Sequence, residues 1–322
     1  MPDANPLVTY RDLIAANRRH SVILIGCMLL LFAFVGSAVA VAATARGGGE
    51  VVASAAVTGA IVAIAVGGLV SAWSWFGGGK AILRMAGARP IRKEDDPQLF
   101  NVVEELSLSG GLPMPEVWMI EDPALNAFAT GRDPAHAAVA ITRGLRTQLT
   151  RDELAGVMAH ELAHVRSYDI RFAMLMATLV GMIAFASEVF LRIGIRGGLA
   201  GGRRSGGKGG NPIAIVLVIV AIVLLVLSPF AAMAIRMAFS RRREYLADAG
   251  AVDLTRDPRG LISALRKLGG STVPVASHNA AIAPLYMVEP AKARRPGRPE
   301  KAGLFDTHPP LAERIRRLEA LL

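Results

Sequence analysis

The sequence has a single cysteine, Cys27, among its 322 residues. One cysteine excludes a disulfide within the chain and argues against a metal site built from thiolates. Acidic residues are also fewer than basic ones. The chain has 26 aspartates and glutamates and 36 lysines and arginines, which gives a net charge of +10. The chain is instead rich in hydrophobic residues, 52% of the total, which are bunched into long uncharged runs. This combination indicates an integral membrane protein rather than soluble domains.

The excess of basic residues lies beside the apolar runs and in the tract AKARRPGRPEKAG (291–303). Lysines and arginines next to membrane spans contact anionic lipid headgroups. Nucleic acid is the competing partner for so basic a chain, but no recognition module for it is visible. We therefore expect a lipid bilayer with anionic headgroups, and no nucleic acid, as the partner of these charges.

The first apolar run, SVILIGCMLLLFAFVGSAVAVAA (21–43), is long enough to cross a bilayer. At about 1.5 Å per residue it reaches roughly 34 Å. A signal peptide is the alternative, since Arg18 and Arg19 precede the run and AATA (42–45) offers small residues for cleavage. However, the apolar part of a signal peptide has only about 7–15 residues, so a membrane span is favoured.

A second apolar run, 51–76, forms a hairpin with the first and sets the orientation of the chain. The loop between the runs contains only Arg46 and Glu50 as charged residues. Basic residues flank the pair on its outer sides, at Arg18, Arg19, Lys80, Arg84, Arg89, Arg92 and Lys93. Because lysine and arginine are enriched on the cytoplasmic side, the N-terminus and the segment after residue 80 are predicted to be cytoplasmic.

The next segment, 81–170, is soluble in character and predicts a helix, short strands and a second helix. PQLFNVVEELSLSG (97–110) has the amphipathic pattern of a helix ending at glycine. Strands are predicted at EVWMIE (116–121), NAFATG (126–131) and AAVAIT (137–142). Thr150 and Glu153 match a capping box, so a helix is expected from 151 to about 168.

HELAH (160–164) lies on that capped helix. Residues four apart share one face of a helix, so His160 and His164 can aim ring nitrogens at the same ion. Glu161 is turned about 100° round the helix and can reach a water on the metal without competing as a ligand. This is the pattern of a hydrolytic zinc site, and it is favoured over two ordinary surface histidines.

Two further apolar runs, near 172–191 and 213–235, precede a second soluble segment with helices predicted over 240–254 and 309–322. In the first of these helices Glu244 and Asp248 are also four residues apart. One carboxylate could complete a His₂Glu site while the other bonds to a ligand histidine. From the residues alone, a solvated pair that offsets the neighbouring arginines is the favoured interpretation, because charged runs usually form solvated faces.

Together these motifs resemble the HtpX-type membrane zinc metalloproteases, relatives of the CAAX prenyl proteases. The resemblance spans nearly the whole chain, including the order of apolar runs, and rests on HELAH (160–164), SRRREYLADAGA (240–251), ALNAFATG (124–131) and THPPLAERIRRL (307–318). It implies that Glu244 is the third zinc ligand and that Asp248 is a buried acid bonded to His160.

The resemblance also implicates Asn126 and His308 as residues near the substrate carbonyl that stabilise the oxyanion. From the sequence alone they would be a turn residue and a loop histidine. Asp169 is either another acid bonded to a ligand or simply a residue at the helix end. Strand 137–142 is expected to be a free sheet edge that takes substrate as an added strand.

The expected fold is an α+β membrane protein with about four transmembrane helices and a mostly helical, gluzincin-like zincin domain with a small sheet. Because His160 and Glu244 must meet, the two later runs either both cross the membrane or neither does. Their length favours crossing, whereas the basic linker between them opposes it. The expected segments are two membrane hairpins and two parts of a catalytic domain, at 1–80, 171–239, 81–170 and 240–322.

The expected function is a zinc endopeptidase of the cell inner membrane, with one Zn²⁺ per subunit and its active site facing the cytoplasm. Unfolded or damaged membrane proteins are the substrates that the resemblance implies. One alternative is a specific processing protease of the CAAX type. The other is a non-catalytic membrane adaptor with a structural zinc, which would need four protein ligands where only three strong candidates exist.

Overall fold

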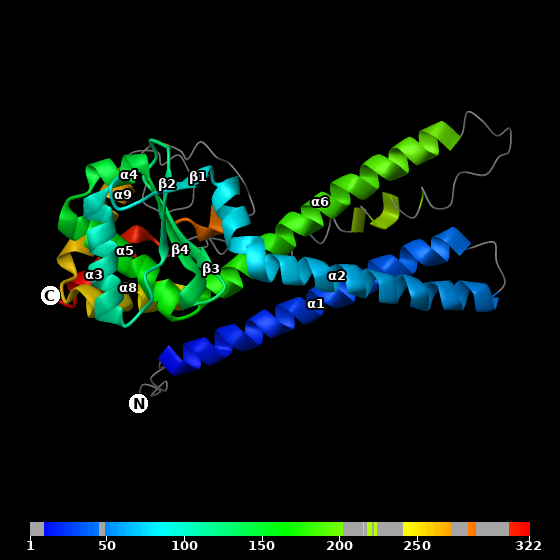
Figure 1. Cartoon of the computed structure of the whole chain (residues 1–322), viewed down its shortest axis with the longest axis horizontal. Coiled ribbons are helices and arrows are strands. Elements are labelled where there is room, and N and C mark those ends of the chain that lie inside the picture. Colours follow the sequence, from blue (N-terminus) through cyan, green and yellow to red (C-terminus); the bar gives the residue numbers. More distant parts are fainter. Residues whose placement is uncertain are drawn as a thin grey trace. The chain divides into compact units, whose positions relative to one another are not determined.

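The protein is described here by a computed structural model, shown in Figure 1. The described residues are 10–44, 49–201, 215, 218–220, 222–223, 241–271, 273, 283–287 and 309–322. They fall into two compact units, the first from Met1–Ser21, Phe76–Met174 and Ile235–Leu322, the second from Val22–Trp75 and Leu175–Ala234.

The second unit contains most of two long apolar helices, α1 (Tyr10–Thr44) and α2 (Gly49–Met85) (Figure 1). Mean hydropathy is 2.7 over Ile14–Val41 and 2.1 over Gly49–Met85, and both stretches are long enough to cross a bilayer. Their apolar side chains are largely exposed, as in lipid-facing helices. Two long apolar helices are therefore present where the sequence predicts the N-terminal membrane hairpin.

Close contact between α1 and α2 depends on two glycines. A Cβ atom added to Gly36 would lie 2.4 Å from the carbonyl oxygen of Gly59, and one added to Gly59 would lie 2.5 Å from that of Gly36. Small residues at such a crossing let two backbones approach in lipid, where packing rather than the hydrophobic effect joins helices. The third apolar run lies in α6 (Asp169–Gly201). Most of run 213–235 lies outside the described residues, so four transmembrane helices stay a prediction.

The first unit contains a four-stranded sheet of β1 (Ala88–Pro90), β2 (Glu116–Ile120), β3 (Ala127–Gly131) and β4 (Ala137–Thr142). The spatial order is β1-β2-β4-β3, with β2 and β4 parallel and the other pairs antiparallel. The predicted strands at 116–121, 126–131 and 137–142 are confirmed to within a residue. The three-residue β1 is too short to leave a pattern in the sequence.

The prediction that strand 137–142 is a free edge is wrong. β4 lies between β2 and β3, and both of its sides are hydrogen-bonded. Its six residues are all buried, as expected for an interior strand with a continuous apolar run. The edge on this side of the sheet is β3, which precedes β4 in the sequence but lies outside it in space.

Helix α5 (Arg151–Arg166) occupies the interior of the first unit, among the helices that surround it in Figure 1. It packs against β3 and three helices, α3 (Pro97–Gly110), α8 (Arg241–Thr255) and α9 (Arg259–Gly270). The short helices α4 (Arg143–Gln148) and α10 (Leu311–Glu319) pack on β4 and on α8 and α9 respectively. The predicted capping box is confirmed, since Thr150 accepts from the Glu153 amide and Glu153 accepts from the Thr150 amide.

Candidate metal centre

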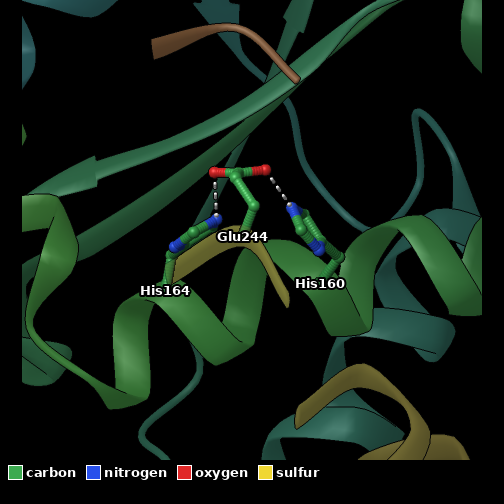
Figure 2. Close-up of side chains that lie close together, drawn as sticks. All are labelled: His160, His164 and Glu244. Atoms are coloured by element: carbon green, nitrogen blue, oxygen red, sulfur yellow. Dashed lines mark ion pairs between the residues drawn. The ribbon is translucent and has the colours of Figure 1, made fainter. Parts of the chain in front are cut away.

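The two histidines of HELAH and a glutamate from α8 converge at one point. His160 and His164 project from successive turns of α5 on either side of the Glu244 carboxylate (Figure 2). The Nε2 atoms of His160 and His164 lie 3.6 and 3.5 Å from the Oε2 and Oε1 atoms of Glu244. One ligand atom from each residue lies within 4.8 Å of the others. Two imidazoles and one carboxylate are a donor set that suits zinc, so these residues fit that ion.

Glu161 lies beside this point and is only 3% exposed. It lines the same cavity as the three candidate ligands, together with apolar side chains from β3, α6 and the segment Ala283–Met287. Burial raises the pKa of the Glu161 carboxyl above its usual range, against the opposing effect of the two histidines. A carboxyl group with a raised pKa is suited to accept and return a proton near neutral pH.

Each candidate histidine ligand is held by a carboxylate through its other ring nitrogen. Asp248 Oδ1 lies 3.0 Å from His160 Nδ1, and Asp169 Oδ2 lies 3.1 Å from His164 Nδ1. Burial lowers the pKa of His160, but bonds to Asp248 and Glu244 outweigh it and raise that pKa to about 9. The negative charge that favours an imidazolium here also favours a cation bound by the ring. The sequence left Asp169 either as an acid bonded to a ligand or as a residue at the helix end. In the structure its carboxylate contacts the candidate ligand His164.

Arg314 of α10 is a member of the site that the sequence reasoning missed. Its side chain is fully buried, and its Nε and Nη2 atoms donate to both oxygens of Asp248 at 2.9 and 2.6 Å. Its Nη1 atom lies 3.5 Å from Glu244 Oε2. A signal was available in the sequence, because Arg314 is three residues after Leu311 and four before Leu318, on the apolar face of α10. The buried carboxylates of Asp248 and Glu244 thus share one buried guanidinium.

Of the two predicted oxyanion residues, the structure describes Asn126. Asn126 is buried at the start of β3, where its Oδ1 atom accepts from the Ala127 amide at 3.1 Å. It is not among the described residues that line the cavity. His308 lies outside the residues that the structure describes.

Comparison with known proteins decides the family. The pattern that defines Peptidase family M48 matches residues 93–322. A protein named "Protease HtpX homolog" from Listeria monocytogenes serotype 4a (strain HCC23) is 40% identical over 311 residues, which cover 95% of this chain and 98% of that protein. The chain belongs to peptidase family M48.

Other relatives of this M48 protein have the same name. The "Protease HtpX homolog" of Streptococcus pneumoniae (strain ATCC BAA-255 / R6) is 41% identical over 311 residues, or 96% of this chain and 99% of that one. The crystal structure of S. mikatae Ste24p is 20% identical with a TM-score of 0.44, covering 80% of this chain and 64% of that chain. So partial a structural likeness adds nothing to the assignment.

Family membership makes the protein a membrane metalloprotease, a hydrolase that acts on protein substrates, with a metal that is typically zinc. The interpretation as a non-catalytic adaptor is therefore wrong. Nothing in the family name identifies the substrate or the residues that cleave it.

Proposed function

We propose that this M48 protease is a zinc endopeptidase that cleaves misfolded or damaged membrane proteins at the cytoplasmic face of the cell inner membrane. The observation that carries the proposal is the convergence of His160, His164 and Glu244 in one buried cavity with Glu161 beside them. A catalytic carboxylate next to a three-ligand site has no use in a structural zinc site, which four protein ligands close.

His160, His164 and Glu244 would hold one Zn²⁺ per subunit. When bound, zinc supplies the positive charge that polarises a carbonyl and makes a water nucleophilic at neutral pH. Asp248 and Asp169 would orient the two imidazoles by accepting from their Nδ1–H groups, which leaves each Nε2 atom to face Glu244 and the ion.

Glu161 would act as the general base and then as the general acid. It takes a proton from the attacking water as the water oxygen bonds to the scissile carbonyl carbon. It then gives this proton to the amide nitrogen as the carbon–nitrogen bond breaks, so that an amine leaves. Asn126 and His308 would donate to the oxyanion between these steps. In support, Asn126 directly precedes β3, whose Ala129 lines the cavity.

Substrate would bind as an additional strand along β3 rather than along β4. β3 is the outermost strand of the sheet, and Ala129 in its centre lines the cavity of the candidate site. The Ala127 carbonyl already accepts from the Met287 amide at 2.9 Å, so substrate would pair with the part of β3 that follows Ala127. Main-chain pairing of this kind reads the backbone of a substrate and few of its side chains. Weak sequence preference suits quality control better than the precise processing of a CAAX-type enzyme.

The cytoplasmic placement is supported by charge. The sequence between the uncharged runs 21–43 and 51–76 has few charges, whereas basic residues precede the first run and follow the second. Since lysine and arginine stay on the cytoplasmic side, both chain segments outside this hairpin would be cytoplasmic, including the candidate metal centre.

The proposal is tested by cleavage of an unfolded soluble protein by zinc-loaded enzyme purified in detergent. Wild type is compared with Glu161→Ala and with the control Asp152→Ala, an exposed carboxylate on the same helix. We expect Glu161→Ala to retain zinc and lose at least a hundredfold in cleavage rate, and the control to match wild type. Cleavage by Glu161→Ala at the wild-type rate would refute the role of Glu161 as general base. Absence of bound zinc in every variant, wild type included, would refute the assignment of the three zinc ligands. Cleavage of prenylated peptides but not of the unfolded protein would favour the CAAX-type alternative.

A further inference from the structure

A polar side chain near the start of α1 is buried in the first unit. Asn17 lies within the apolar stretch Ile14–Val41, yet its side chain is only 3% exposed. Its Nδ2 atom donates to Asp169 Oδ1 at 2.6 Å and to the carbonyl oxygen of Ser167 at 3.0 Å. Its Oδ1 atom accepts from Arg243 Nη1 at 3.2 Å. Both donors and the acceptor of this amide are therefore used.

These contacts fix which way the Asn17 amide faces. Turning it by 180° would point the NH₂ group at the Arg243 guanidinium and the carbonyl at the Asp169 carboxylate, and both contacts would become repulsive. The amide is thus locked between a cation from α8 and an anion from α6. An asparagine can donate to Asp169 and accept from Arg243 at the same time. An ionised aspartate has no donor for the first contact, and a lysine has no acceptor for the second.

Asp169 connects Asn17 to the candidate metal centre. One carboxylate oxygen, Oδ2, accepts from Ser167 Oγ at 2.8 Å and lies 3.1 Å from His164 Nδ1. The other, Oδ1, receives the Asn17 amide at 2.6 Å and has Arg243 Nη1 at 3.4 Å. Asn17 therefore provides the shorter of the two contacts that hold Oδ1 and keep Oδ2 turned toward His164.

We infer that Asn17 is a positioning residue for the metal centre, acting from the first membrane helix through Asp169 on the orientation of His164. The inference rests on the proposed function, in which His164 is a zinc ligand. A hydrogen-bond partner behind a ligand histidine fixes the tautomer and the ring orientation. The chain would therefore link its apolar N-terminal helix to the geometry of its own metal site.

The direct test is the zinc dissociation constant, measured by competition with a chelator in full-length protein in detergent. Asn17→Ala is expected to weaken zinc binding roughly 3- to 10-fold, less than the 10- to 100-fold typical when the direct partner of a ligand is removed. Ser21→Ala is the matched control. Ser21 is also buried and lies one turn further along α1, but its hydroxyl donates only to the Asn17 carbonyl at 2.8 Å. The Ser21→Ala protein is expected to bind zinc with the wild-type dissociation constant.

A second comparison separates positioning from a general loss of packing. If Asn17 acts through Asp169, adding Asn17→Ala to an Asp169→Ala protein is expected to change the zinc dissociation constant by less than about twofold. Additive effects of the two substitutions would overturn the inference. Asn17→Ser, whose hydroxyl is too short to reach Asp169, replaces the alanine variant if that variant does not fold.

The outcomes also separate this inference from the proposed function. If wild type binds zinc and cleaves protein while Asn17→Ala and Asn17→Ser keep the wild-type zinc dissociation constant, the inference alone is overturned. If wild type binds no zinc, the ligand assignment fails and the inference fails with it. A loss of affinity in both Asn17 variants that disappears in the Asp169→Ala background supports it.

Discussion

Arg314 shows how much a single residue contributes to this site. Its guanidinium neutralises the Asp248 carboxylate within a cluster that also contains Glu244 and Glu161, all of them buried. The pKa of Arg314 is raised because Asp248 outweighs the effect of burial, so the side chain stays charged. Breaking a buried pair by removing one partner is costly, because the remaining charge stays out of water.

We therefore predict that Arg314→Met lowers the free energy of unfolding by about 3–5 kcal/mol. Arg316→Met, on the same helix but with 75% of its side chain exposed, is expected to change it by no more than about 0.5 kcal/mol. Denaturant unfolding of the zinc-free proteins in detergent measures both. Equal losses in the two variants would show that Asp248 does not depend on Arg314.

Among the elements, α5 is held to α9 by a buried charge whose effect depends on pH. Burial alone would raise the pKa of Glu153, but hydrogen bonds from Lys267, Ser263 and the Thr150 amide lower it to about 2. A carboxyl group whose pKa is lower in the folded state stabilises the fold above its unfolded pKa, about 4.5. This contribution is lost as the pH falls from about 4.5 toward 2.

Glu153→Gln is accordingly expected to be less stable than wild type at pH 7, by on the order of 2–3 kcal/mol. The difference in stability should shrink as the pH falls below about 4.5, because wild type then loses the stabilisation from the ionised Glu153 carboxylate, which the variant lacks at every pH. Unfolding curves at several pH values between 7 and 3 measure it. Parallel curves, with a constant difference at every pH, would contradict the role given to the ionised carboxylate.

The crossing of α5 and α9 also depends on Gly156. Alanine has the higher intrinsic helix propensity, so propensity alone predicts that Gly156→Ala stabilises α5. However, the added Cβ would lie 2.5 Å from the backbone nitrogen of Leu261. We predict a loss of about 1–3 kcal/mol in the free energy of unfolding. Gly181→Ala is the control, since a Cβ there meets nothing within 4 Å. A stabilised Gly156→Ala protein would refute this packing.

Elements with local signals were predictable from the sequence, and those that depend on tertiary contacts were not. The capping box at Thr150 and Glu153 fixed the start of α5, and the apolar pattern at 137–142 fixed β4. The place of β4 inside the sheet follows from pairing with β2 and β3, which no local pattern encodes. Arg314 was missed for the same kind of reason. A buried arginine is recognised by the carboxylates that meet it, and these come from distant parts of the chain.

At the scale of the whole molecule, the two apolar helices and the candidate metal centre must be placed relative to the membrane. With basic residues on either side of the two apolar runs and few charges between them, the proposed topology puts Glu50 on the outer side. It puts Glu94, in the first unit, on the cytoplasmic side. Both side chains are exposed, so a cysteine at either position is accessible to a reagent.

The single cysteine makes this topology simple to measure. In a Cys27→Ser background, Glu50→Cys should react with a membrane-impermeant maleimide in right-side-out vesicles, and Glu94→Cys should react only after the membrane is opened. The charge bias requires this result, since moving the basic segments outward would go against the preference of lysine and arginine for the cytoplasm. The reverse labelling pattern would put the protease on the outer face and exclude cytoplasmic substrates. Labelling of both positions in sealed vesicles would mean that α1 and α2 do not form a spanning hairpin.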